Sequence, residues 1–354
     1  MNRETLLKQL SQITPADEFA MEQAKKRWDS IAKPLGSLGL LEDALIRVVG
    51  LTGDVSCDLS KKGVLVFCAD NGVVAQGVTQ TGSEVTAVVA ENLTRAQTSV
   101  CRMARVAGAT VIPVDVGMNT VVDVPGLVQK KAGMGTKDIS VGPAMEEEQF
   151  FSALETGIEL VRECKENGYR LLATGEMGIG NTTTSSAVAS VLLGLPPEKV
   201  TGKGAGLSDS GLLRKVEVIR EAIRVNAPDP SDPLDVVRKV GGFDIAGIMG
   251  AFLGGALYGV PVLADGFISC VAALCAVRAC PLAKKAVFAS HVSAEPAGHM
   301  VLEALGLEPL ITARMRLGEG TGAVAAMPLF DMAAAVYRGM STFSDIEIEE
   351  YKPL

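Results

Sequence analysis

The chain has 354 residues, of which 48% are hydrophobic and only 4% aromatic, and it carries a formal net charge of -8. This length allows one large α/β domain with a smaller appendage, and the 38 glycines favour helices packed closely on a sheet. We expect no nucleic-acid partner, because a phosphate backbone requires clustered Lys and Arg and the sequence has no such cluster.

The seven cysteines form no C-x-x-C pair, and their odd number fits neither a disulfide framework nor a zinc site. Because His291 and His299 are the only histidines, a metal centre would need mainly carboxylates, and we expect neither a metal nor another cofactor. The N-terminus carries charges from Arg3 and Glu4 onward and has no apolar run of the signal-peptide type. These features favour a cytoplasmic protein with reduced, buried cysteines.

The first sixty residues are charged and amphipathic, and they include Trp28, the only tryptophan. We expect them to form a small helical domain, residues 1–60, which part of the tail, about 328–354, joins. The large α/β catalytic domain is then expected over residues 61–327.

Six apolar, β-branched segments each end in a polar or glycine-rich tip, and helix-length segments separate most of them. This alternation predicts a mainly parallel, Rossmann-like sheet with helices on both faces. Ligands of such sheets bind outside the carboxyl ends of the strands, so we expect the tips to define one site. The candidate strands are Val64–Ala69, Thr110–Val114, Leu171–Ala173, Val260–Ala264, Ala286–Ala289 and Leu310–Ala313, and the candidate helices are Glu84–Ala107, Glu146–Asn167, Thr182–Leu193, Gly266–Arg278 and Ala294–Leu305.

One segment, Ile245–Ala264, imitates a membrane span, because it holds no charge and contains a Gly250-x-x-x-Gly254 spacing. Pro261 and the surrounding alternation favour a buried helix that ends near Gly259 and is followed by a short strand. We therefore expect no membrane span.

The strongest local motif runs from Leu171 to Thr184 and reads as a strand, a glycine loop and a helix start. This arrangement aims backbone N–H groups and a helix N-terminus at one point, which suits a phosphate. The motif is no Walker A loop, and it lacks the acidic magnesium loop of enzymes that use phosphoribosyl pyrophosphate. A monophosphate bound without metal fits better, and the alternative is a tight turn capped by Asn181 or Thr182. The residues expected to contact the phosphate and its sugar are Gly178, Gly180, Asn181, Thr182 and Thr183.

A second glycine run, Gly202–Asp209, precedes Lys215, which we expect on the next helix. Either Lys203 or Lys215 could neutralise a bound phosphate. A cation on such a helix is more often simply solvated, so both interpretations stay open.

A glutamate stands between glycines in Gly318-Glu319-Gly320. Glycine neighbours remove side-chain bulk and permit backbone angles closed to other residues, so this carboxylate can meet a ligand at close range. On its own the pattern fits an acidic residue in a flexible turn even better.

His291 lies at a predicted strand end beside Ser290, Ser293 and Glu295, which suggests a hydrolytic Ser-His-acid arrangement. No Gly-x-Ser-x-Gly elbow is present, however. We expect instead that Ser293 caps the next helix and that His291 orders the loop.

Jointly the motifs resemble one family, the nicotinate-nucleotide:dimethylbenzimidazole phosphoribosyltransferases, which make the lower-ligand nucleotide of cobalamin. The resemblance covers nearly the whole chain. It rests, in this order, on Lys33–Gly39 with Leu41-Glu42, Ala69–Val73, Gly175–Thr183, Gly241–Ala246, Ala264–Phe267 and Arg316–Gly322.

The resemblance implies transfer of the 5-phosphoribosyl group from nicotinate mononucleotide to 5,6-dimethylbenzimidazole, with inversion at the anomeric carbon and release of nicotinate. In this family the general base corresponds to Glu319. Glu176 would be a second acidic group that stabilises positive charge on the ribosyl ring, a role inferred from charge. The expected assembly is a homodimer, although some phenol-activating relatives pair unlike subunits.

Two departures from the family pattern concern the acceptor. The family commonly has histidine at the position of Asn71, and the segment after Thr79 lacks the usual Tyr-Pro. We expect a roomier or more polar acceptor-base pocket, lined by Asn71, Thr81, Ser83 and Leu317. The open alternatives are another benzimidazole, adenine, phenol or cresol as acceptor, or an idle paralogue that completes a partner subunit.

Overall fold

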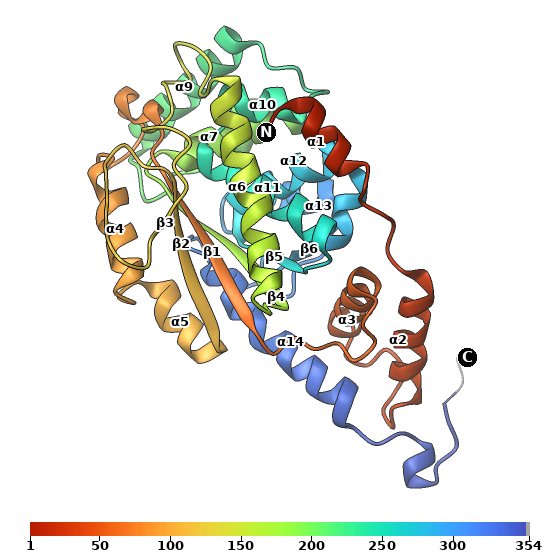
Figure 1. The fold of residues 1–354 in the computed structure, drawn as a ribbon. Helices are drawn as coiled ribbons and strands as arrows, with labels where there is room; N and C mark the ends of the chain where they lie inside the picture. Colours follow the sequence, from red (N-terminus) through yellow and green to blue (C-terminus); the bar gives the residue numbers. More distant parts are fainter. Residues whose placement is uncertain (352–354) are drawn as a thin grey trace.

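A computed structural model describes residues 1–351, which form a six-stranded sheet with helices on both faces (Figure 1). All pairings are parallel, and the strand order is β3-β2-β1-β4-β5-β6. This order is that of a Rossmann fold, in which the strand order reverses between β1 and β4. The predicted fold class is confirmed. The strands are β1 (Lys62–Ala69), β2 (Ala109–Gly117), β3 (Val128–Gln129), β4 (Leu171–Met177), β5 (Val262–Ala264) and β6 (Val287–Ala289).

The helices α6 and α11 pack on each other along one face of the sheet, whereas α5 and α14 pack together on the other. The α-helices are α1 (Arg3–Leu10), α2 (Glu18–Ser30), α3 (Leu40–Thr52), α4 (Glu84–Thr94), α5 (Ser99–Ala107), α6 (Glu147–Glu166), α7 (Asn181–Leu193), α8 (Pro197–Val200), α9 (Asp209–Asn226), α10 (Pro233–Val240), α11 (Phe243–Tyr258), α12 (Gly266–Ala279), α13 (Gly298–Leu305) and α14 (Thr321–Gly339). Short 3-10 helices are η1 (Gly72–Gln76), η2 (Pro281–Ala286) and η3 (Ser344–Ile346).

The apolar segment that imitates a membrane span is a buried helix, as predicted. α11 ends at Tyr258, its C-cap residue Gly259 has a left-handed φ of 66°, and the short strand β5 follows. A Cβ on Gly250 would lie 2.0 Å from the Leu154 carbonyl oxygen of α6, so glycine is what allows the two helices to approach this closely. Within residues 1–351, none of the helices combines the length and the apolar character that a membrane crossing requires.

Two predicted elements are wrong in detail. Leu310–Ala313 is not a strand, since only Ile311 pairs, in a single bridge to His291, and the sixth strand is the two-residue β3 instead. The predicted helix Glu84–Ala107 is two helices, because the chain turns after α4 and Ala96 adopts a left-handed φ of 55° before α5 begins. A strand as short as β3 leaves too little periodicity for a sequence pattern to detect.

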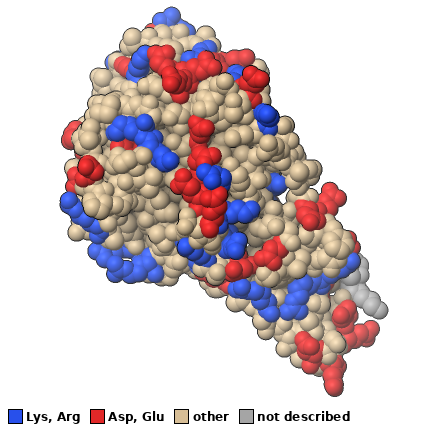
Figure 2. Space-filling model, viewed as in Figure 1, with Lys and Arg blue, Asp and Glu red and all other residues tan. Residues whose placement is uncertain are grey.

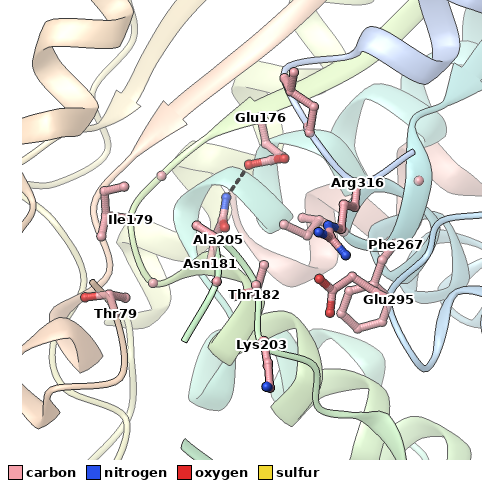
Figure 3. A pocket seen from close by; sticks show the side chains of 18 of the residues that line it. Thr79, Glu176, Ile179, Asn181, Thr182, Lys203, Ala205, Phe267, Glu295 and Arg316 are labelled. Atoms are coloured by element: carbon pink, nitrogen blue, oxygen red, sulfur yellow. Dashed lines mark hydrogen bonds between the residues drawn. The ribbon is translucent and has the colours of Figure 1, made fainter. Parts of the chain in front are cut away.

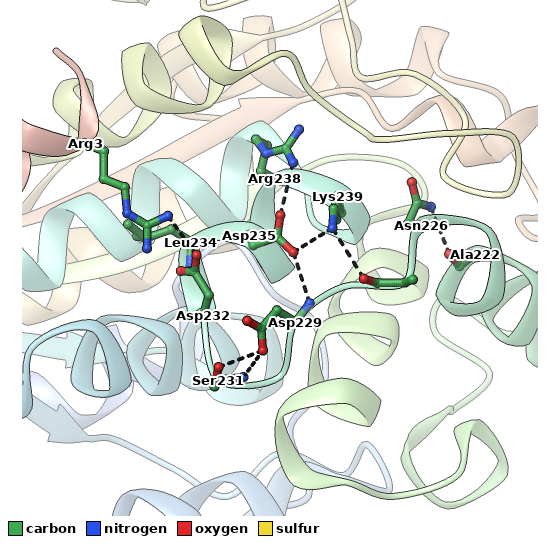
Figure 4. A network of polar contacts seen from close by, with 11 residues as sticks. Arg3, Ala222, Asn226, Asp229, Ser231, Asp232, Leu234, Asp235, Arg238 and Lys239 are labelled. Carbon is green, nitrogen blue, oxygen red and sulfur yellow. Dashed lines mark hydrogen bonds and ion pairs between the residues drawn. The ribbon is translucent and has the colours of Figure 1, made fainter.

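The helical extension at one end of the molecule contains α2, α3 and the end of α14 (Figure 1). Trp28 of α2 packs on Tyr337 of α14, with ring centroids 5.1 Å apart. α1, by contrast, lies against the main body, where its Arg3 pairs with Asp232 at 2.7 Å beside the turn that precedes α10 (Figure 4). The division into residues 1–60 with 328–354 and residues 61–327 stays a prediction.

Charged side chains are mixed on the face shown in Figure 2, where small groups of Lys and Arg alternate with Asp and Glu. The α10 helix illustrates the pattern, because Asp235 pairs with both Arg238, at 3.0 Å, and Lys239, at 2.8 Å (Figure 4). Such short-range pairs are typical of a solvated helix face.

Candidate active site

A cavity of about 250 Å³ opens at the carboxyl ends of β4 and β5. Ten of the thirteen residues predicted from the sequence line it, so the motifs that are far apart in the chain do meet at one place. These ten are Glu176, Gly178, Gly180, Asn181, Thr182, Lys203, Lys215, Thr81, Leu317 and Glu319.

Glu319 projects from a backbone that ordinary residues avoid. Gly318, Glu319 and Gly320 have φ angles of 89°, 61° and 93°, so three consecutive residues are left-handed. A Cβ on Gly175 of β4 would lie 2.4 Å from the Glu319 carbonyl oxygen, so that glycine lets the loop lie directly on the strand. Glycines near Glu319 therefore allow both the left-handed backbone of the loop and its close packing on β4.

The Glu319 carboxylate is half-buried, and its Oε2 accepts a hydrogen bond of 3.2 Å from the backbone N–H of Val100 in the first turn of α5. The Glu319 N–H in turn donates to the carbonyl oxygen of Glu176, over 3.2 Å. The loop that carries one glutamate is thus bonded to the strand that carries the other.

Glu176 lies near the end of β4 in a more enclosed setting, where its Oε2 accepts a hydrogen bond from the Asn181 side chain (Figure 3). Burial and the neighbouring Asp244 carboxylate raise the pKa of Glu176 well above its usual value. Burial also raises the pKa of Asp244 to about 6. The Asp244 side chain is fully buried and its Oδ2 has no hydrogen-bond partner within residues 1–351.

The glycine loop after β4 leads into α7, and backbone N–H groups at the start of this helix have no partner within residues 1–351. Gly180, with a φ of 94°, is the N-terminal cap residue, and no side chain caps the helix. Asn181 bonds to Glu176 and Thr182 to Lys215, so neither performs the capping role that was the alternative. The N–H groups of Gly180 and Thr182 make no hydrogen bond with any part of the chain that the structure describes. The arrangement favours an anion at this helix terminus.

The structure distinguishes the two lysines. Lys215 lies on α9 with a side chain that is almost fully buried, and its Nζ is 2.8 Å from Thr182 Oγ1 and 3.2 Å from the Gly202 carbonyl oxygen. Burial lowers the pKa of the Lys215 ammonium to about 8. Lys203 is half-exposed and pairs with Asp209 at 2.6 Å. Lys215 is therefore the cation built into the cavity beside the α7 N-terminus.

Three predicted residues do not line the cavity. Asn71 is buried behind the glycine loop, where its Nδ2 donates to the Ile179 carbonyl oxygen over 3.4 Å. Thr183 points into the protein interior with a buried hydroxyl, and Ser83 precedes α4. Asn71 thus supports the glycine loop without lining the cavity.

The expected cap at Ser293 is wrong, because α13 begins five residues later, at Gly298. The Ser293 hydroxyl instead accepts a hydrogen bond of 3.2 Å from the N–H of Glu295 within the loop. His291 does lie at a strand end and lines the cavity.

Several residues that were not predicted to contact a substrate also line the cavity. Arg316, Glu295 and Phe267 lie close together on one side of the cavity (Figure 3). The Arg316 guanidinium forms no hydrogen bond or ion pair with any of residues 1–351, which leaves it available to an anionic ligand. The sequence signal for Arg316 was its position two residues before Gly318, in the loop that carries Glu319. Gln80 also lines the cavity, where its side-chain amide donates to the Gly206 carbonyl oxygen.

Known proteins match this chain over almost its entire length. A family profile described as Phosphoribosyltransferase matches residues 13–348. The chain is 47% identical to the nicotinate-nucleotide–dimethylbenzimidazole phosphoribosyltransferase of Acetivibrio thermocellus, covering 98% of this chain and 99% of that protein. It is 45% identical to the protein of the same name from Clostridium acetobutylicum, covering 100% of both. The chain belongs to this phosphoribosyltransferase family.

A solved member of the family has the same fold. The crystal structure of CobT from Thermus thermophilus superposes with a TM-score of 0.88 at 39% identity, covering 94% of this chain and 100% of that one. In this chain one cavity combines Lys215 and the uncapped N-terminus of α7 with the carboxyl groups of Glu176 and Glu319. This arrangement can hold a phosphorylated sugar at one end and handle a proton at the other.

Proposed function

We propose that this enzyme transfers the 5-phosphoribosyl group from nicotinate mononucleotide to 5,6-dimethylbenzimidazole, giving α-ribazole 5′-phosphate and nicotinate for the nucleotide loop of cobalamin. The observation that carries the proposal is the pairing, in one cavity, of the Lys215 anion site with the Glu319 carboxylate. The names of the relatives that match the full length of the chain support the same substrates.

The donor phosphate would bind at the α7 N-terminus, where the N–H groups of Gly180 and Thr182 and the Lys215 ammonium converge. Arg316 would supply a second positive charge to the anionic donor. This placement would point the anomeric carbon toward the two glutamates. Binding at a remote phosphate holds the reacting atoms in place and lowers the entropic part of the barrier.

In the chemical step the bond from the anomeric carbon to the pyridinium nitrogen breaks, and its electron pair neutralises the departing nicotinate ring. The unprotonated nitrogen of the acceptor forms the new bond to the same carbon from the opposite face. The other ring nitrogen loses its proton to Glu319, which acts as the general base. Glu176 would stabilise the positive charge that develops on the ribosyl ring.

We also propose a homodimer in the cytoplasm, on the strength of the family resemblance and of the seven cysteines. All seven thiols are buried and free of disulfide bonds within residues 1–351, which suits a reducing compartment. A heterodimer with a paralogue is the second candidate, and size measurement of the chain expressed alone distinguishes the two.

The test is a product assay with nicotinate mononucleotide and a panel of acceptors: dimethylbenzimidazole, other benzimidazoles, adenine, phenol and cresol. We expect nicotinate release matched by α-ribazole phosphate, with the same rate after addition of magnesium or a chelator. Metal-dependent activity with phosphoribosyl pyrophosphate would contradict the assigned donor, and inactivity with every acceptor would favour an idle paralogue.

A further inference from the structure

Asp265 directly follows β5 and precedes α12, yet its carboxylate does not cap α12. The side chain turns instead toward the loop that carries Glu319. Its Oδ2 accepts a hydrogen bond of 3.0 Å from the N–H of Gly320, and its Oδ1 accepts bonds of 2.7 Å from Gly322 and 3.1 Å from Ala323. One carboxylate thus holds three of the four backbone donors that follow Glu319.

The surroundings keep this carboxylate in one position. Asp265 is 6% exposed, and the His291 ring lies beside it with Nδ1 3.8 Å from Asp265 Oδ1. A Cβ on Gly322 would lie 1.9 Å from His291 Nδ1, so the ring also rests directly on the first turn of α14. The loop therefore has little room to shift while the carboxylate and the ring stay in place.

The Glu319 backbone needs such support. Gly318, Glu319 and Gly320 are all left-handed, and an L-residue such as Glu319 adopts that conformation at an energetic cost. A strained backbone of this kind persists only where the surrounding structure determines it. The three bonds to Asp265 begin at the residue next to Glu319, which makes them the nearest fixed point on its C-terminal side.

We infer that Asp265 is a positioning residue for Glu319: it fixes the left-handed loop from which the general base reaches the acceptor. This inference rests on the proposed function of Glu319. Asparagine could not replace Asp265, because its single oxygen can serve either Gly320 or the Gly322–Ala323 pair, and its amide group would face the other N–H donors. Asp265→Asn should therefore remove at least one of the hydrogen bonds to the loop without changing the size of the cavity.

The test is a double-mutant cycle of Asp265→Asn and Glu319→Gln. Asp265→Asn alone should lower kcat by about tenfold to a hundredfold and leave KM for nicotinate mononucleotide within about threefold of wild type. Added to Glu319→Gln, the same substitution should change kcat by less than about threefold, because the group it positions is already gone. The inference would be overturned if the two substitutions lowered kcat independently, so that their losses multiplied in the double mutant. A rise in KM for nicotinate mononucleotide in Asp265→Asn, as large as the loss of kcat, would also overturn it.

The control is Asp17→Asn, which alters another helix cap, where Asp17 Oδ1 accepts a 2.9 Å bond from the Ala20 N–H of α2. This substitution should lower the melting temperature and leave kcat unchanged. If Asp265→Asn does not fold, Asp265→Glu keeps the charge and displaces the oxygens, and it should show the same loss and the same non-additivity.

Hydrogen exchange separates this inference from the proposed function. In Asp265→Asn the amides of residues 320–323 should exchange faster by at least about tenfold, while those of α7 keep their wild-type rates. Unchanged exchange at 320–323 would overturn the role of Asp265 even in an active enzyme. A wild-type enzyme inactive with every acceptor would instead refute the proposed function and leave this measurement to decide whether Asp265 orders the loop.

Discussion

The two glutamates of the cavity carry the same functional group in different environments. Glu176 is bonded to Asn181 and lies near the buried Asp244 carboxylate, and burial raises its pKa well above the usual value. Glu319 is half-buried on a left-handed loop, where its carboxylate accepts the Val100 N–H of α5. The local environment, more than residue type, places one carboxyl in a network of buried acidic groups and leaves the other on a loop at the cavity, where we propose that it meets the acceptor.

This contrast shows how one site can give two carboxyl groups different tasks. One can accept a proton, and the other can stabilise positive charge on the sugar. A general base must be within reach of the acceptor, and the loop position of Glu319 at the cavity fits the role that we propose for it. Burial makes Glu176 hold its proton more tightly in the free enzyme, and positive charge that develops on the sugar would favour the ionised form of this carboxyl. If the contrast holds, substitutions at the two positions should differ in size, in pH dependence and in sensitivity to the acceptor.

The largest effect is expected at the base. Glu319→Gln should lower kcat with a benzimidazole by about two to four powers of ten, because the acceptor N–H then has no proton acceptor. Donor binding, measured by titration with nicotinate mononucleotide, should stay near wild type. Turnover close to wild type would remove Glu319 from the mechanism.

The next effect is expected at the anion site. Lys215→Met should raise KM for nicotinate mononucleotide by about ten- to a hundredfold, the size of one lost charged hydrogen bond. Its melting temperature should not fall, since a buried ammonium is costly to the folded state. The matched control is Lys203→Met, which should leave KM within about threefold, because Lys203 is half-exposed and paired with Asp209.

Lys215 also predicts a pH dependence. Its pKa of about 8 means that the free enzyme loses this positive charge as the pH rises through 8. Donor affinity should therefore fall above pH 8 in the wild type and stay flat in Lys215→Met. A wild-type affinity that is constant from about pH 7 to about pH 9.5 would contradict the assignment.

Glu176→Gln should have a smaller effect on rate, a loss of kcat of about tenfold, because glutamine keeps the bond to Asn181. Stability gives the sharper readout. A folded-state pKa above the unfolded value means that the unfolding free energy of the wild type declines as the pH rises above about 4.5. Glu176→Gln should reduce that slope, as urea titrations from about pH 4.5 to about pH 8 would show. An unchanged slope would mean that Glu176 is not the group whose retained proton causes the pH dependence.

The smallest effects are expected among acceptors. Thr81 and Leu317 line the cavity, but Asn71 does not, so the feature that suggested a roomier pocket acts only from behind the loop. A methyl-sized change in a pocket alters specificity by about 1–3 kcal/mol, so rates should be graded among benzimidazole, methylbenzimidazole and dimethylbenzimidazole. A preference above about a thousandfold among these three would contradict the graded pocket.

The sequence predicted the sheet, and it predicted that both glutamates lie at one place, because these features rest on local patterns: apolar runs, polar tips and glycine pairs. It could not decide between Lys203 and Lys215, because the choice depends on which helix face is buried. It gave no role to Asp265, because the hydrogen-bond partners of that carboxylate lie 55 or more residues further along the chain. It gave none to Arg316, because the place of that side chain in the cavity depends on how its loop folds. The position of Asn71 depends on its contact with Ile179, 108 residues further along the chain, which no local pattern encodes.

The central claim is that Glu319 removes the acceptor proton whereas Glu176 does not. A series of benzimidazoles with increasingly electron-withdrawing substituents has an increasingly acidic N–H, and such acceptors need a base less. The ratio of wild-type to Glu319→Gln turnover should therefore fall steadily along the series, while the ratio for Glu176→Gln stays constant. Equal, flat ratios for both variants would contradict the account.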